Sequence, residues 1–561
     1  MQGRIENKSL IISCTGVAYL KLKAALSKNI GDKFSSTKES ITIPLQYIPR
    51  IHQVLPPEIV AMPLVNAAIL DYSKHAAGVE VSKVILTQTG FDSSSIPLFW
   101  QNILEPAQSV AVAAMTVPDL LGLCLFDEQG SGKTVMTIAA FDILKSQRII
   151  DAMIVVCPKS MVNEWPKDIN RFLPGKYKVE VPSGDRQAKY KSALKAFDII
   201  VTNFETIALM QSAISGAAQT LNFLLVVDES FYVKNASALR SHITAEIRSN
   251  CKKCYLLCGS PAPNSPYDII NQFDLADLGY TFNNFSKSKD EKKDREIITK
   301  LVDTRGAFIR RLKTDILASV PTKNFHIIKA NLKGRQLLLY EKARFELLLE
   351  LKGLDNTTFK KHLASYFQKR AALLQICTTP SSIDPTIIDT PVKYEKIDNL
   401  LNDLISAKRK VIIWSFFKSS IEELFARYSK YDPLRIDGTT DSNHRSEYVN
   451  LFQNDPNRML FIGNPAAAGA GITLHSSYDA IYVSFSNQAA HYLQSLDRIH
   501  RRGQKAAAVN YYIIICENTI EEKEIIRLRK KELQQHSLLG DHITWPTTLD
   551  DALNELDSHG K

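Results

Sequence analysis

One short segment constrains the fold of this chain more than any other. It is Asp127–Thr134, with the sequence DEQGSGKT, and it lies between two apolar runs, Leu121–Phe126 and Val135–Leu144. A buried strand, a glycine-rich turn and a helix in this order can hold a triphosphate, because backbone N–H groups and the helix N-terminus attract phosphate oxygens. The segment therefore predicts a phosphate-binding turn; a glycine turn before an ordinary helix is the alternative.

The residue types of this turn predict its chemistry. Lys133 is placed to reach the outer phosphates, and the Thr134 hydroxyl to ligate Mg²⁺. Gly130, Ser131 and Gly132 would supply the backbone that surrounds the phosphates. ATP and Mg²⁺ are the cofactors that we expect.

Composition narrows the class of protein. The chain has 561 residues, of which 45% are hydrophobic and 23% charged, so it is globular and long enough for three or four domains. Its net charge of +10 is compatible with nucleic acid as a partner but does not establish one. No apolar run approaches the roughly 18–20 residues of a membrane span, and the N-terminus lacks a signal segment. We expect an intracellular protein with no membrane partner.

The cysteines do not predict a metal site. Cys251, Cys254 and Cys258 form a CxxC pair with a third thiol, but a structural zinc site needs a fourth ligand and none stands nearby. Cys258 also ends an apolar stretch that is typical of a buried strand.

Two blocks of the sequence alternate between apolar, strand-like runs and helical stretches. This alternation predicts parallel sheets covered by helices on both faces. The strand candidates of the first block are Leu121–Phe126, Ala152–Cys157, Asp198–Thr202, Leu221–Val227 and Cys254–Cys258. Those of the second block are Val411–Phe416, Leu434–Asp437, Met459–Gly463, Ala480–Phe485 and Val509–Ile515.

The remaining segments complete the predicted domain division. Residues 1–95 form an accessory α/β domain, with strands expected at Ser9–Cys14, Ile41–Tyr47 and Ser82–Gln88 and helices at Ala18–Ser27 and Pro57–His75. Residues 96–265 form the first lobe, 266–391 a helical insertion and linker, 392–518 the second lobe, 519–540 a bracing helix and 541–561 a peripheral acidic tail. Within the insertion, 281–300 is a charged helix or loop and 333–377 is helical.

Two further clusters complete a candidate site. Asp228 and Glu229 end an apolar strand, where the first acid can hold Mg²⁺ and the second can polarise the attacking water. In the second block, Arg498 and Arg501 belong to the segment QSLDRIHRRGQ, and arginine offers a permanently charged fork to a γ-phosphate. The alternatives are an acidic pair without function and a basic helix on a solvated face.

Together these segments resemble the motifs of Swi/Snf-type double-stranded-DNA translocases of helicase superfamily 2, over about residues 100–535. The matching segments are LEPAQSVAV (Leu104–Val112), DEQGSGKT, VVCPKSMVNEW (Val155–Trp165), VTNFET (Val201–Thr206), DESFYVKNASA (Asp228–Ala238), CGSPAPN (Cys258–Asn264), FIRRLKTDIL (Phe308–Leu317), VIIWSFF (Val411–Phe417), RIDGTT (Arg435–Thr440), GAGITL (Gly469–Leu474), QSLDRIHRRGQ (Gln494–Gln504) and TIEEKE (Thr519–Glu524). The resemblance implies two RecA-like parallel-sheet lobes with helical insertions between them, plus the small N-terminal α/β domain.

The resemblance also implies roles for single residues. Gln108 is expected near the adenine, and Gln494 at the nucleotide. Contacts to duplex phosphates, which would not depend on base sequence, are expected from Pro158, Lys159, Ser160, Thr202, Asn203, Ser415, Gly469 and Gly471. For Lys159, Ser160, Thr202 and Asn203 the alternative is that they only cap helices.

The chain departs from the family pattern at a few positions. Phe231 stands where the family usually has a histidine that couples nucleotide state to the motif containing Ser260. Ser131 and Ser260 are mild substitutions, and Asn487–His491 lacks the usual Trp-Asn-Pro. Because the histidine is neither metal ligand nor base, we still expect hydrolysis, with Phe231 and Ser260 as the coupling positions.

Three functions remain open at this point. The first is remodelling of branched DNA by branch migration, fork regression or unwinding, in replication, recombination or repair; the short region between the blocks and the lack of a histone-reader segment favour it. The second is displacement of proteins from DNA, with residues 1–95 as the surface for a protein partner. The third is a non-hydrolysing DNA-binding scaffold. We expect a monomer, in the cytoplasm of a bacterial or phage-infected cell, or in the nucleus if the source is eukaryotic.

Overall fold

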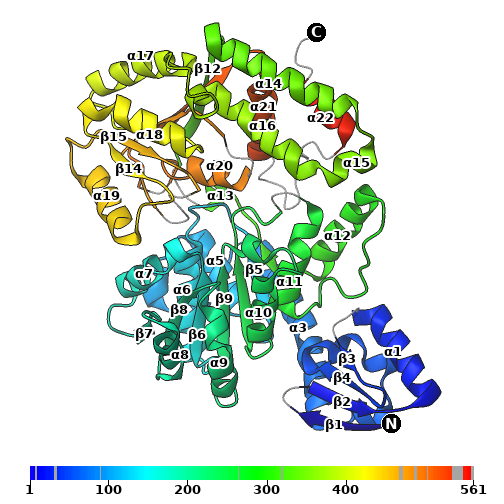
Figure 1. Cartoon of the computed structure of the whole chain (residues 1–561). Coiled ribbons are helices and arrows are strands. Elements are labelled where there is room, and N and C mark those ends of the chain that lie inside the picture. Colours follow the sequence, from blue (N-terminus) through cyan, green and yellow to red (C-terminus); the bar gives the residue numbers. More distant parts are fainter. Residues whose placement is uncertain are drawn as a thin grey trace. The chain divides into compact units, whose positions relative to one another are not determined.

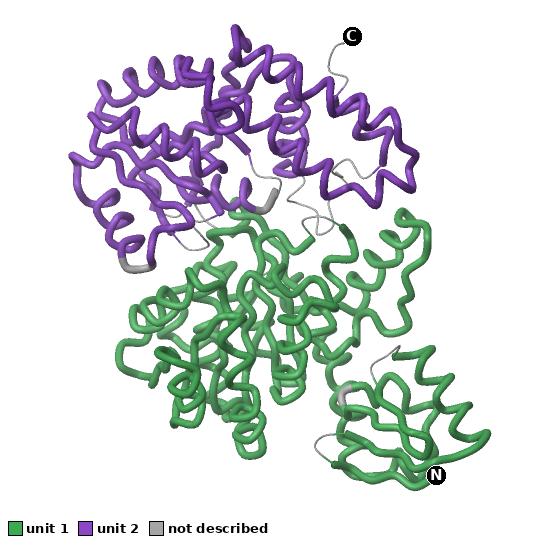
Figure 2. Tube along the Cα trace, viewed as in Figure 1, with its two compact units in different colours: residues 1–316 green, residues 317–561 purple. Residues whose placement is uncertain are grey.

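The chain folds into two compact units, residues 1–316 and 317–561 (Figure 2). The computed structural model describes residues 1–6, 9–30, 34–88, 90–262, 265–316, 320–466, 472–485, 489–501, 503–533 and 548–556. Each unit contains one parallel sheet with helices around it, and the first unit also carries a small antiparallel sheet (Figure 1). This architecture confirms the predicted fold class. No helix among the described residues is long and apolar enough to cross a membrane.

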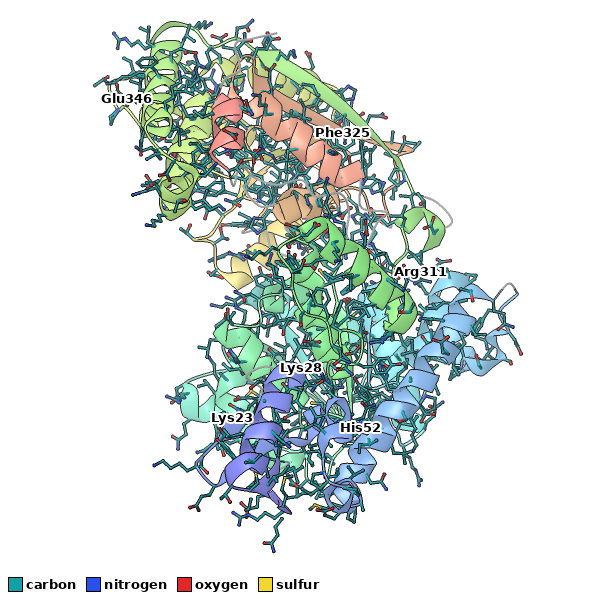
Figure 3. All side chains as sticks on the ribbon, turned by 90° about the vertical axis from the view of Figure 1, so that its right-hand side faces the viewer. Lys23, Lys28, His52, Arg311, Phe325 and Glu346 are labelled. Atoms are coloured by element: carbon teal, nitrogen blue, oxygen red, sulfur yellow. The ribbon has the colours of Figure 1, made fainter. Side chains whose placement is uncertain are left out.

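The N-terminal part of the first unit is a four-stranded antiparallel sheet with one helix against it. Its strands, in sheet order, are β1 (Gln2–Glu6), β2 (Ser9–Ser13), β4 (Ser40–Pro44) and β3 (Ser35–Ser36). Alternate residues of β2 and β4 are buried and pack with the apolar side of α1 (Gly16–Ile30). Lys23 and Lys28 project from α1 (Figure 3). The strands expected at 9–14 and 41–47 and the helix at 18–27 are confirmed.

A long helix joins this part to the first lobe and corrects two predictions. The expected helix 57–75 is broken into α2 (Pro57–Val60) and α3 (Pro63–Thr87), because a proline disfavours helical geometry in the residue before it. The strand expected at 82–88 is wrong, since α3 continues to Thr87. Burial at helical spacing, as at His75, Val79 and Ser82, outweighs the strand propensity of this segment.

Two contacts fix α3 to the lobe. His75 Nδ1 accepts a hydrogen bond from the Leu121 N–H at 3.1 Å. Lys83 Nζ donates to the carbonyl oxygens of Asp303 at 2.9 Å and Thr304 at 2.7 Å. The Asp303 and Thr304 carbonyls belong to α12 (Glu291–Arg305). The charged segment 281–300 predicted this helix in part.

The first parallel sheet has seven strands among the described residues. In sheet order they are β11 (Phe308–Ile309), β5 (Gly122–Leu125), β10 (Lys253–Leu257), β9 (Phe223–Asp228), β6 (Ala152–Cys157), β8 (Ile199–Asn203) and β7 (Val179–Glu180). The helices around the sheet include α5 (Pro106–Met115), α6 (Lys133–Ser146), α7 (Glu164–Phe172), α8 (Arg186–Leu194), α9 (Gln211–Ala217), α10 (Leu239–Arg248), α11 (Ile270–Asp277) and α13 (Lys313–Ile316). All five predicted strands are present; β7 and β11 have only two residues each, too few for an apolar pattern.

Among the residues that the structure describes, the second unit has a six-stranded parallel sheet. In sheet order its strands are β12 (Thr322–Ala330), β17 (Ala508–Cys516), β16 (Asp479–Tyr482), β13 (Val411–Trp414), β15 (Leu460–Gly463) and β14 (Leu434–Ile436). Its helices include α14 (Gly334–Lys352), α15 (Asn356–Lys361), α16 (Leu363–Thr378), α17 (Val392–Ser406), α18 (Lys418–Arg427), α19 (Ser442–Asn454) and α20 (Ala489–Leu496). The helical prediction for 333–377 and the five strand predictions are confirmed.

One strand of the second sheet was not predicted. β12 lies in the segment 266–391, which we expected to be helical, and it pairs with β17 over nine residues at the sheet edge. Phe325 of β12, labelled in Figure 3, stacks on Tyr511 with ring centroids 4.9 Å apart, and the Arg529 guanidinium lies 3.4 Å from its ring centroid. Since β11 also comes from 266–391, this segment supplies an edge strand to each sheet.

The C-terminal region is more integrated than its composition suggests. α21 (Ile520–Leu533) confirms the predicted bracing helix. The peripheral tail expected at 541–561 is wrong for α22 (Leu549–Leu556), whose Ala552 and Leu556 are fully buried in the core cluster that includes α14 and α16 residues. The rest of the tail lies outside the described residues.

Candidate nucleotide-binding site

The predicted phosphate-binding turn is present at the carboxyl end of β5. The strand ends at Leu125 and α6 begins at Lys133. Gly130 and Gly132 have φ angles of +81° and +91°, a region that favours glycine. A Cβ atom at Gly132 would lie 2.4 Å from Gln108 Nε2, so the loop also lacks room for a side chain there.

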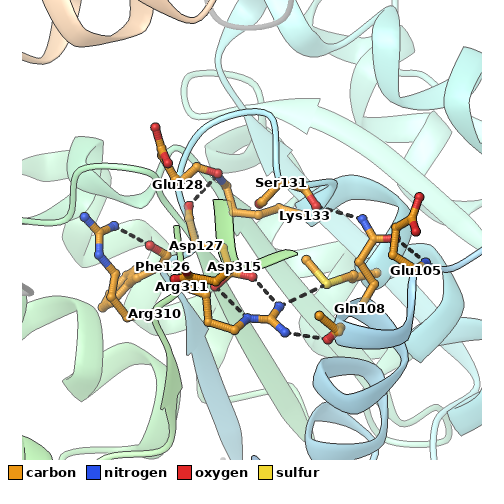
Figure 4. Close-up of polar contacts among 12 residues, drawn as sticks. Glu105, Gln108, Phe126, Asp127, Glu128, Ser131, Lys133, Arg310, Arg311 and Asp315 are labelled. Carbon is orange, nitrogen blue, oxygen red and sulfur yellow. Dashed lines mark hydrogen bonds and ion pairs between the residues drawn. The ribbon is translucent and has the colours of Figure 1, made fainter. Parts of the chain in front are cut away.

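The Lys133 ammonium lies over the loop. Its Nζ donates to the carbonyl oxygens of Asp127 at 2.9 Å and Glu128 at 3.2 Å (Figure 4). Thr134, in the first turn of α6, is half-buried, and Ser131 is fully buried. The Lys133 ammonium and the N-terminus of α6 both attract phosphate, and both lie at this loop.

Gln108 supports the loop from α5. Its Nε2 donates to the Ser131 carbonyl oxygen at 2.7 Å, and its Oε1 accepts from the Glu105 N–H at 3.0 Å (Figure 4). The predicted contact of Gln108 with the adenine stays a prediction.

Asp228 is the last residue of β9, as the sequence predicts. Its Oδ2 accepts from Trp165 Nε1 at 3.0 Å, and its Oδ1 accepts from the Glu229 N–H at 2.9 Å. Burial raises the pKa of the Asp228 carboxyl, although the Trp165 hydrogen bond and the charge of Lys133 act in the opposite direction. The structure thus brings together the loop lysine and the acidic pair, which are separated by 95 or more residues in the sequence.

Glu229 has an unusual backbone. Its φ of +50° and ψ of +55° place it in the left-handed region, and its side chain is only 5% exposed. Gln129 Nε2, from the loop, donates to Glu229 Oε1 at 2.9 Å. The sequence predicted the glutamate but gave no sign of its partner.

The oxygen donors of this site fit a magnesium ion. Mg²⁺ is usually held by one or two carboxylates together with substrate phosphates and water, and Asp228 and the Thr134 hydroxyl provide oxygen ligands of these kinds. In the second unit, Cys377, Cys516 and Glu521 have ligand atoms within 4.8 Å of one another. There, however, Glu521 forms an ion pair with the buried ammonium of Lys393 at 2.6 Å, and burial raises the pKa of the Cys377 thiol, so neither group offers a metal ion an uncompensated negative charge. Cys254 and Cys258 are buried in and directly after β10.

Two arginines that follow β11 hold the start of the loop. Arg311 Nη2 lies 2.5 Å from Asp127 Oδ2, and Arg311 Nη1 donates to the Ala107 carbonyl oxygen (Figure 4). Arg310 Nη1 donates to the carbonyl oxygens of Phe126 and, at 2.8 Å, Gly259. The resemblance of the FIRR segment to a family motif predicts no role for these arginines, because only the pairing of β11 with β5 brings them to Phe126 and Asp127, 184 positions away.

Hydrogen bonds connect residues next to the coupling candidates Phe231 and Ser260. The Phe231 ring stacks on Tyr232 with centroids 4.4 Å apart, and Ser260 is half-buried. A buried polar route runs beside them: Ser230 Oγ donates to Gln272 Oε1 at 2.6 Å, and Gln272 Nε2 donates to the Pro261 carbonyl oxygen at 2.7 Å. A coupling role for Phe231 and Ser260 stays a prediction.

The DNA-contact candidates of the first unit lie at the carboxyl ends of two neighbouring strands. β6 and β8 pair with Cys157 opposite Asn203, so Pro158, Lys159 and Ser160 follow one strand beside the end of the other. Lys159 is exposed, whereas the Thr202 side chain is only 2% exposed.

Asn203 has a local structural role. Its Oδ1 accepts from the N–H groups of Glu205 at 3.1 Å and Thr206 at 2.8 Å, which stabilises the turn after β8. A DNA contact from Asn203 or from its neighbours stays a prediction.

The candidates of the second unit lie on and after α20 and at the end of β13. Gln494 and Arg498 are buried, and Arg498 Nη1 donates to the Ile472 carbonyl oxygen at 3.2 Å. Arg501, one turn later, is half-buried, and its charge lowers the pKa of His475, adding to the larger effect of burial. Ser415 is buried and lies 3.0 Å from Ser484, oxygen to oxygen. Gly469 and Gly471 lie outside the described residues.

Comparisons with known proteins give the same picture. The family model described as SNF2-related domain matches residues 36–382, and the one described as helicase conserved C-terminal domain matches residues 392–503. An uncharacterized ATP-dependent helicase of Mycoplasma genitalium is 27% identical over 430 residues, which cover 75% of this chain and 40% of the relative. The ISWI chromatin-remodeling complex ATPase ISW1 of Saccharomyces cerevisiae is 25% identical over 437 residues, which cover 72% of this chain and 38% of the relative.

Among solved structures, the Sulfolobus solfataricus SWI2/SNF2 ATPase core in complex with dsDNA is 21% identical, with coverage of 78% of this chain and 94% of that chain and a TM-score of 0.37.

The chain spans about 40% of the length of the two curated relatives named above. The first family model, however, matches more than half of the chain. The chain belongs to the SNF2-related family and carries a helicase C-terminal domain in its second unit.

Proposed function

We propose that the chain is an ATP-hydrolysing motor that moves along double-stranded DNA. The observation that carries this proposal is the convergence, within the first unit, of the loop lysine Lys133 with the acidic pair Asp228 and Glu229. Family membership supports it, since both relatives named above are described as an ATP-dependent helicase or an ATPase.

The residues divide the reaction among them. Lys133 and the N-terminus of α6 bind the β- and γ-phosphates. Thr134 and Asp228 would hold Mg²⁺, which would neutralise phosphate charge. Glu229 orients the water that attacks the γ-phosphorus. Arg498 and Arg501 supply positive charge to the γ-phosphate as the bond to the leaving group breaks.

Binding to DNA is proposed to occur through phosphates. The net charge of +10 favours a polyanion, and Lys159 is exposed at the strand-end edge of the first sheet. Contacts of this kind fix the duplex without reading its sequence, which suits a motor that must move along any sequence.

Branched DNA is the substrate that we place first, with branch migration or fork regression as the outcome. Displacement of bound protein is the second candidate, and the description of the yeast relative as a chromatin-remodeling complex ATPase favours it. Residues 1–95 are the proposed surface for a protein partner in that case.

ATP turnover against a panel of nucleic acids tests the proposal. The panel contains no nucleic acid, single strand, linear duplex, forked duplex and a four-way junction, with strand-exchange products followed in the same reactions and Lys133→Ala as the control. Turnover stimulated by duplex and abolished in Lys133→Ala supports the motor, and its absence contradicts it. Preferential stimulation by forks and junctions, with product formation, supports branched DNA; equal stimulation by linear duplex without such products favours displacement of proteins.

A further inference from the structure

One hydrogen bond at this site belongs to a residue that none of the predicted roles includes. Gln129 lies in the loop between β5 and α6, and its Nε2 donates to Glu229 Oε1 at 2.9 Å. Because Glu229 is 5% exposed, the acceptor is largely removed from water. A hydrogen bond to a carboxylate in such a place is stronger and more directional than one in solvent.

The backbone of Glu229 makes the direction of its side chain depend on such a contact. Its φ of +50° and ψ of +55° turn the chain sharply just after β9 ends at Asp228. A residue other than glycine in this region is strained, and the conformation persists only where surrounding contacts hold it. The Glu229 N–H is bound by Asp228 Oδ1, and its carboxylate is bound by Gln129.

Gln129 is itself held in place from the opposite side. Gly259 follows β10, and a Cβ atom there would lie 2.6 Å from Gln129 Cγ and 3.0 Å from Gln129 Nε2. The stem of the glutamine therefore runs along bare backbone that only glycine allows. Gln129 thus connects three strand ends, those of β5, β9 and β10, and its donor group has little freedom to turn away from Glu229.

We propose that Gln129 is a positioning residue for hydrolysis, which holds the plane of the Glu229 carboxylate so that it can orient the attacking water. The inference rests on the proposed ATP hydrolysis, in which Glu229 has that task. Fixing Oε1 by a hydrogen bond fixes the rotation about the last side-chain bond, and hence the direction of both carboxylate oxygens. ATP binding itself is left to Lys133, Thr134 and the loop backbone.

Two substitutions separate positioning from packing. Gln129→Met keeps the length of the side chain and its contact with Gly259 but removes the donor. Gln129→Glu keeps the shape and sets a second carboxylate against Glu229. We expect kcat for ATP to fall about tenfold in Gln129→Met and further in Gln129→Glu, with KM for ATP within about twofold of wild type. The matched control is Gln147→Met, at the exposed end of α6.

A substitution at Gly259 provides an independent check. In Gly259→Ala the new methyl group displaces Gln129, so kcat is expected to fall as in Gln129→Met. If both act by releasing Glu229, the double variant is no slower than the slower single variant. Thermal unfolding midpoints, measured in the same preparations, show that each variant is folded.

The outcomes are distinct. A kcat of Gln129→Met equal to that of wild type and Gln147→Met overturns the inference while leaving the proposed hydrolysis intact, as does a raised KM with unchanged kcat. A lack of ATP turnover in the wild type overturns both. A selective loss of kcat that is not deepened by Gly259→Ala supports the inference.

Discussion

The two units build the same kind of parallel sheet, and a cluster of buried charges in each has different surroundings. In the first unit the charged groups Asp127, Asp228 and Glu229 lie at or just after the carboxyl ends of β5 and β9. In the second unit, Arg370 forms ion pairs with Glu524 and, at 2.9 Å, with Glu555. These three side chains come from the helices α16, α21 and α22.

The difference teaches what each set of charges does. Charges at the ends of parallel strands face the edge of the sheet where ligands bind in open α/β folds, so they serve chemistry. The charges of Arg370, Glu524 and Glu555 are buried between helices, where Arg527 also pairs with both carboxylates, and the loss of Arg370 leaves these carboxylates less compensated. We therefore expect substitutions in the first set to reduce activity, and substitutions in the second set to reduce stability.

The largest expected effect is on stability, in the second unit. Arg370→Met leaves the carboxylates of Glu524 and Glu555 buried with less compensation, and we expect the free energy of unfolding of α16 and α22 to fall by about 3–5 kcal/mol. Amide hydrogen exchange in these helices measures it. The control is the neighbouring Lys369→Met, whose partly exposed pair with Glu350 is worth about 0–1 kcal/mol. Equal effects of the two substitutions would contradict the contrast between the units.

The next effect is on activity, in the first unit. Lys133→Ala removes the loop cation, and we expect ATP turnover to fall about 100-fold or more. Because Lys133 Nζ donates to carbonyl oxygens of its own loop, the free energy of unfolding should change by less than about 1 kcal/mol. Phosphate release and urea unfolding of the same sample check both statements. A large loss of stability would show that the strand-end charges are structural after all.

The pair Asp127–Arg311 is expected to affect both stability and activity, so it does not follow the division between the two sets of charges. Asp127 is fully buried at the strand end, but it forms an ion pair with Arg311 at 2.5 Å, as the buried carboxylates of the second unit do with Arg370. Arg311→Met is expected to cost about 2–3 kcal/mol of stability, because it strands a buried carboxylate, and also to raise KM for ATP. Urea unfolding and steady-state kinetics measure the two. Arg171→Met, on the exposed end of α7, serves as control, with a change within about 0.5 kcal/mol. An unchanged free energy of unfolding in Arg311→Met would show that Asp127, like Asp228 and Glu229, serves activity and not stability.

The smallest effect is a pH dependence of the second unit. Burial opposes ionisation of Glu555, but the charge of Arg370 and several hydrogen bonds outweigh it and lower the pKa of Glu555 from 4.5 to about 2. Since the folded pKa lies below the unfolded one, this stabilisation is complete above about pH 4.5 and is lost as the pH falls toward 2.

Acid unfolding followed in wild type and Glu555→Gln measures this contribution. Wild type is expected to lose about 1–2 kcal/mol across that window, a component that the variant lacks. Burial raises the pKa of the neighbouring Glu524, and the charge of Glu555 adds to that rise, so part of the difference between the two curves belongs to Glu524. Parallel acid curves for the two proteins would contradict the assignment.

Much of the fold was predictable because it is encoded locally. The apolar run before Asp127 and the glycines at 130 and 132 predict β5 and the turn after it. A buried strand requires consecutive apolar residues, and a positive φ favours glycine, so both features can be read from a few residues. The acidic pair after LLVV was predictable for the same reason. In the candidate site, the lysine, the threonine and the two acids were therefore assigned before any partner was known.

The segments that the sequence predicts wrongly share one cause. The C-terminal half of α3 has the composition of a strand, and the polar edge strand β12 lacks the apolar pattern of one. Their states depend on what lies beside them: α5 and the Leu121 N–H for α3, and β17 for β12. The acidic composition of 541–561 predicts a peripheral tail, because nothing in that segment indicates the buried Arg370 that pairs with Glu555 of α22.

The sequence by itself determined which segments become the central strands, where the phosphate-binding turn lies and which side chains can bind phosphate and metal, because these depend on burial patterns and backbone freedom over a few residues. The tertiary structure alone decided which side chains hold these groups in place. Gln129 meets Glu229 across 100 residues, and Arg311 meets Asp127 across 184, because parallel pairing brings distant strand ends to one edge, a proximity that no local pattern records.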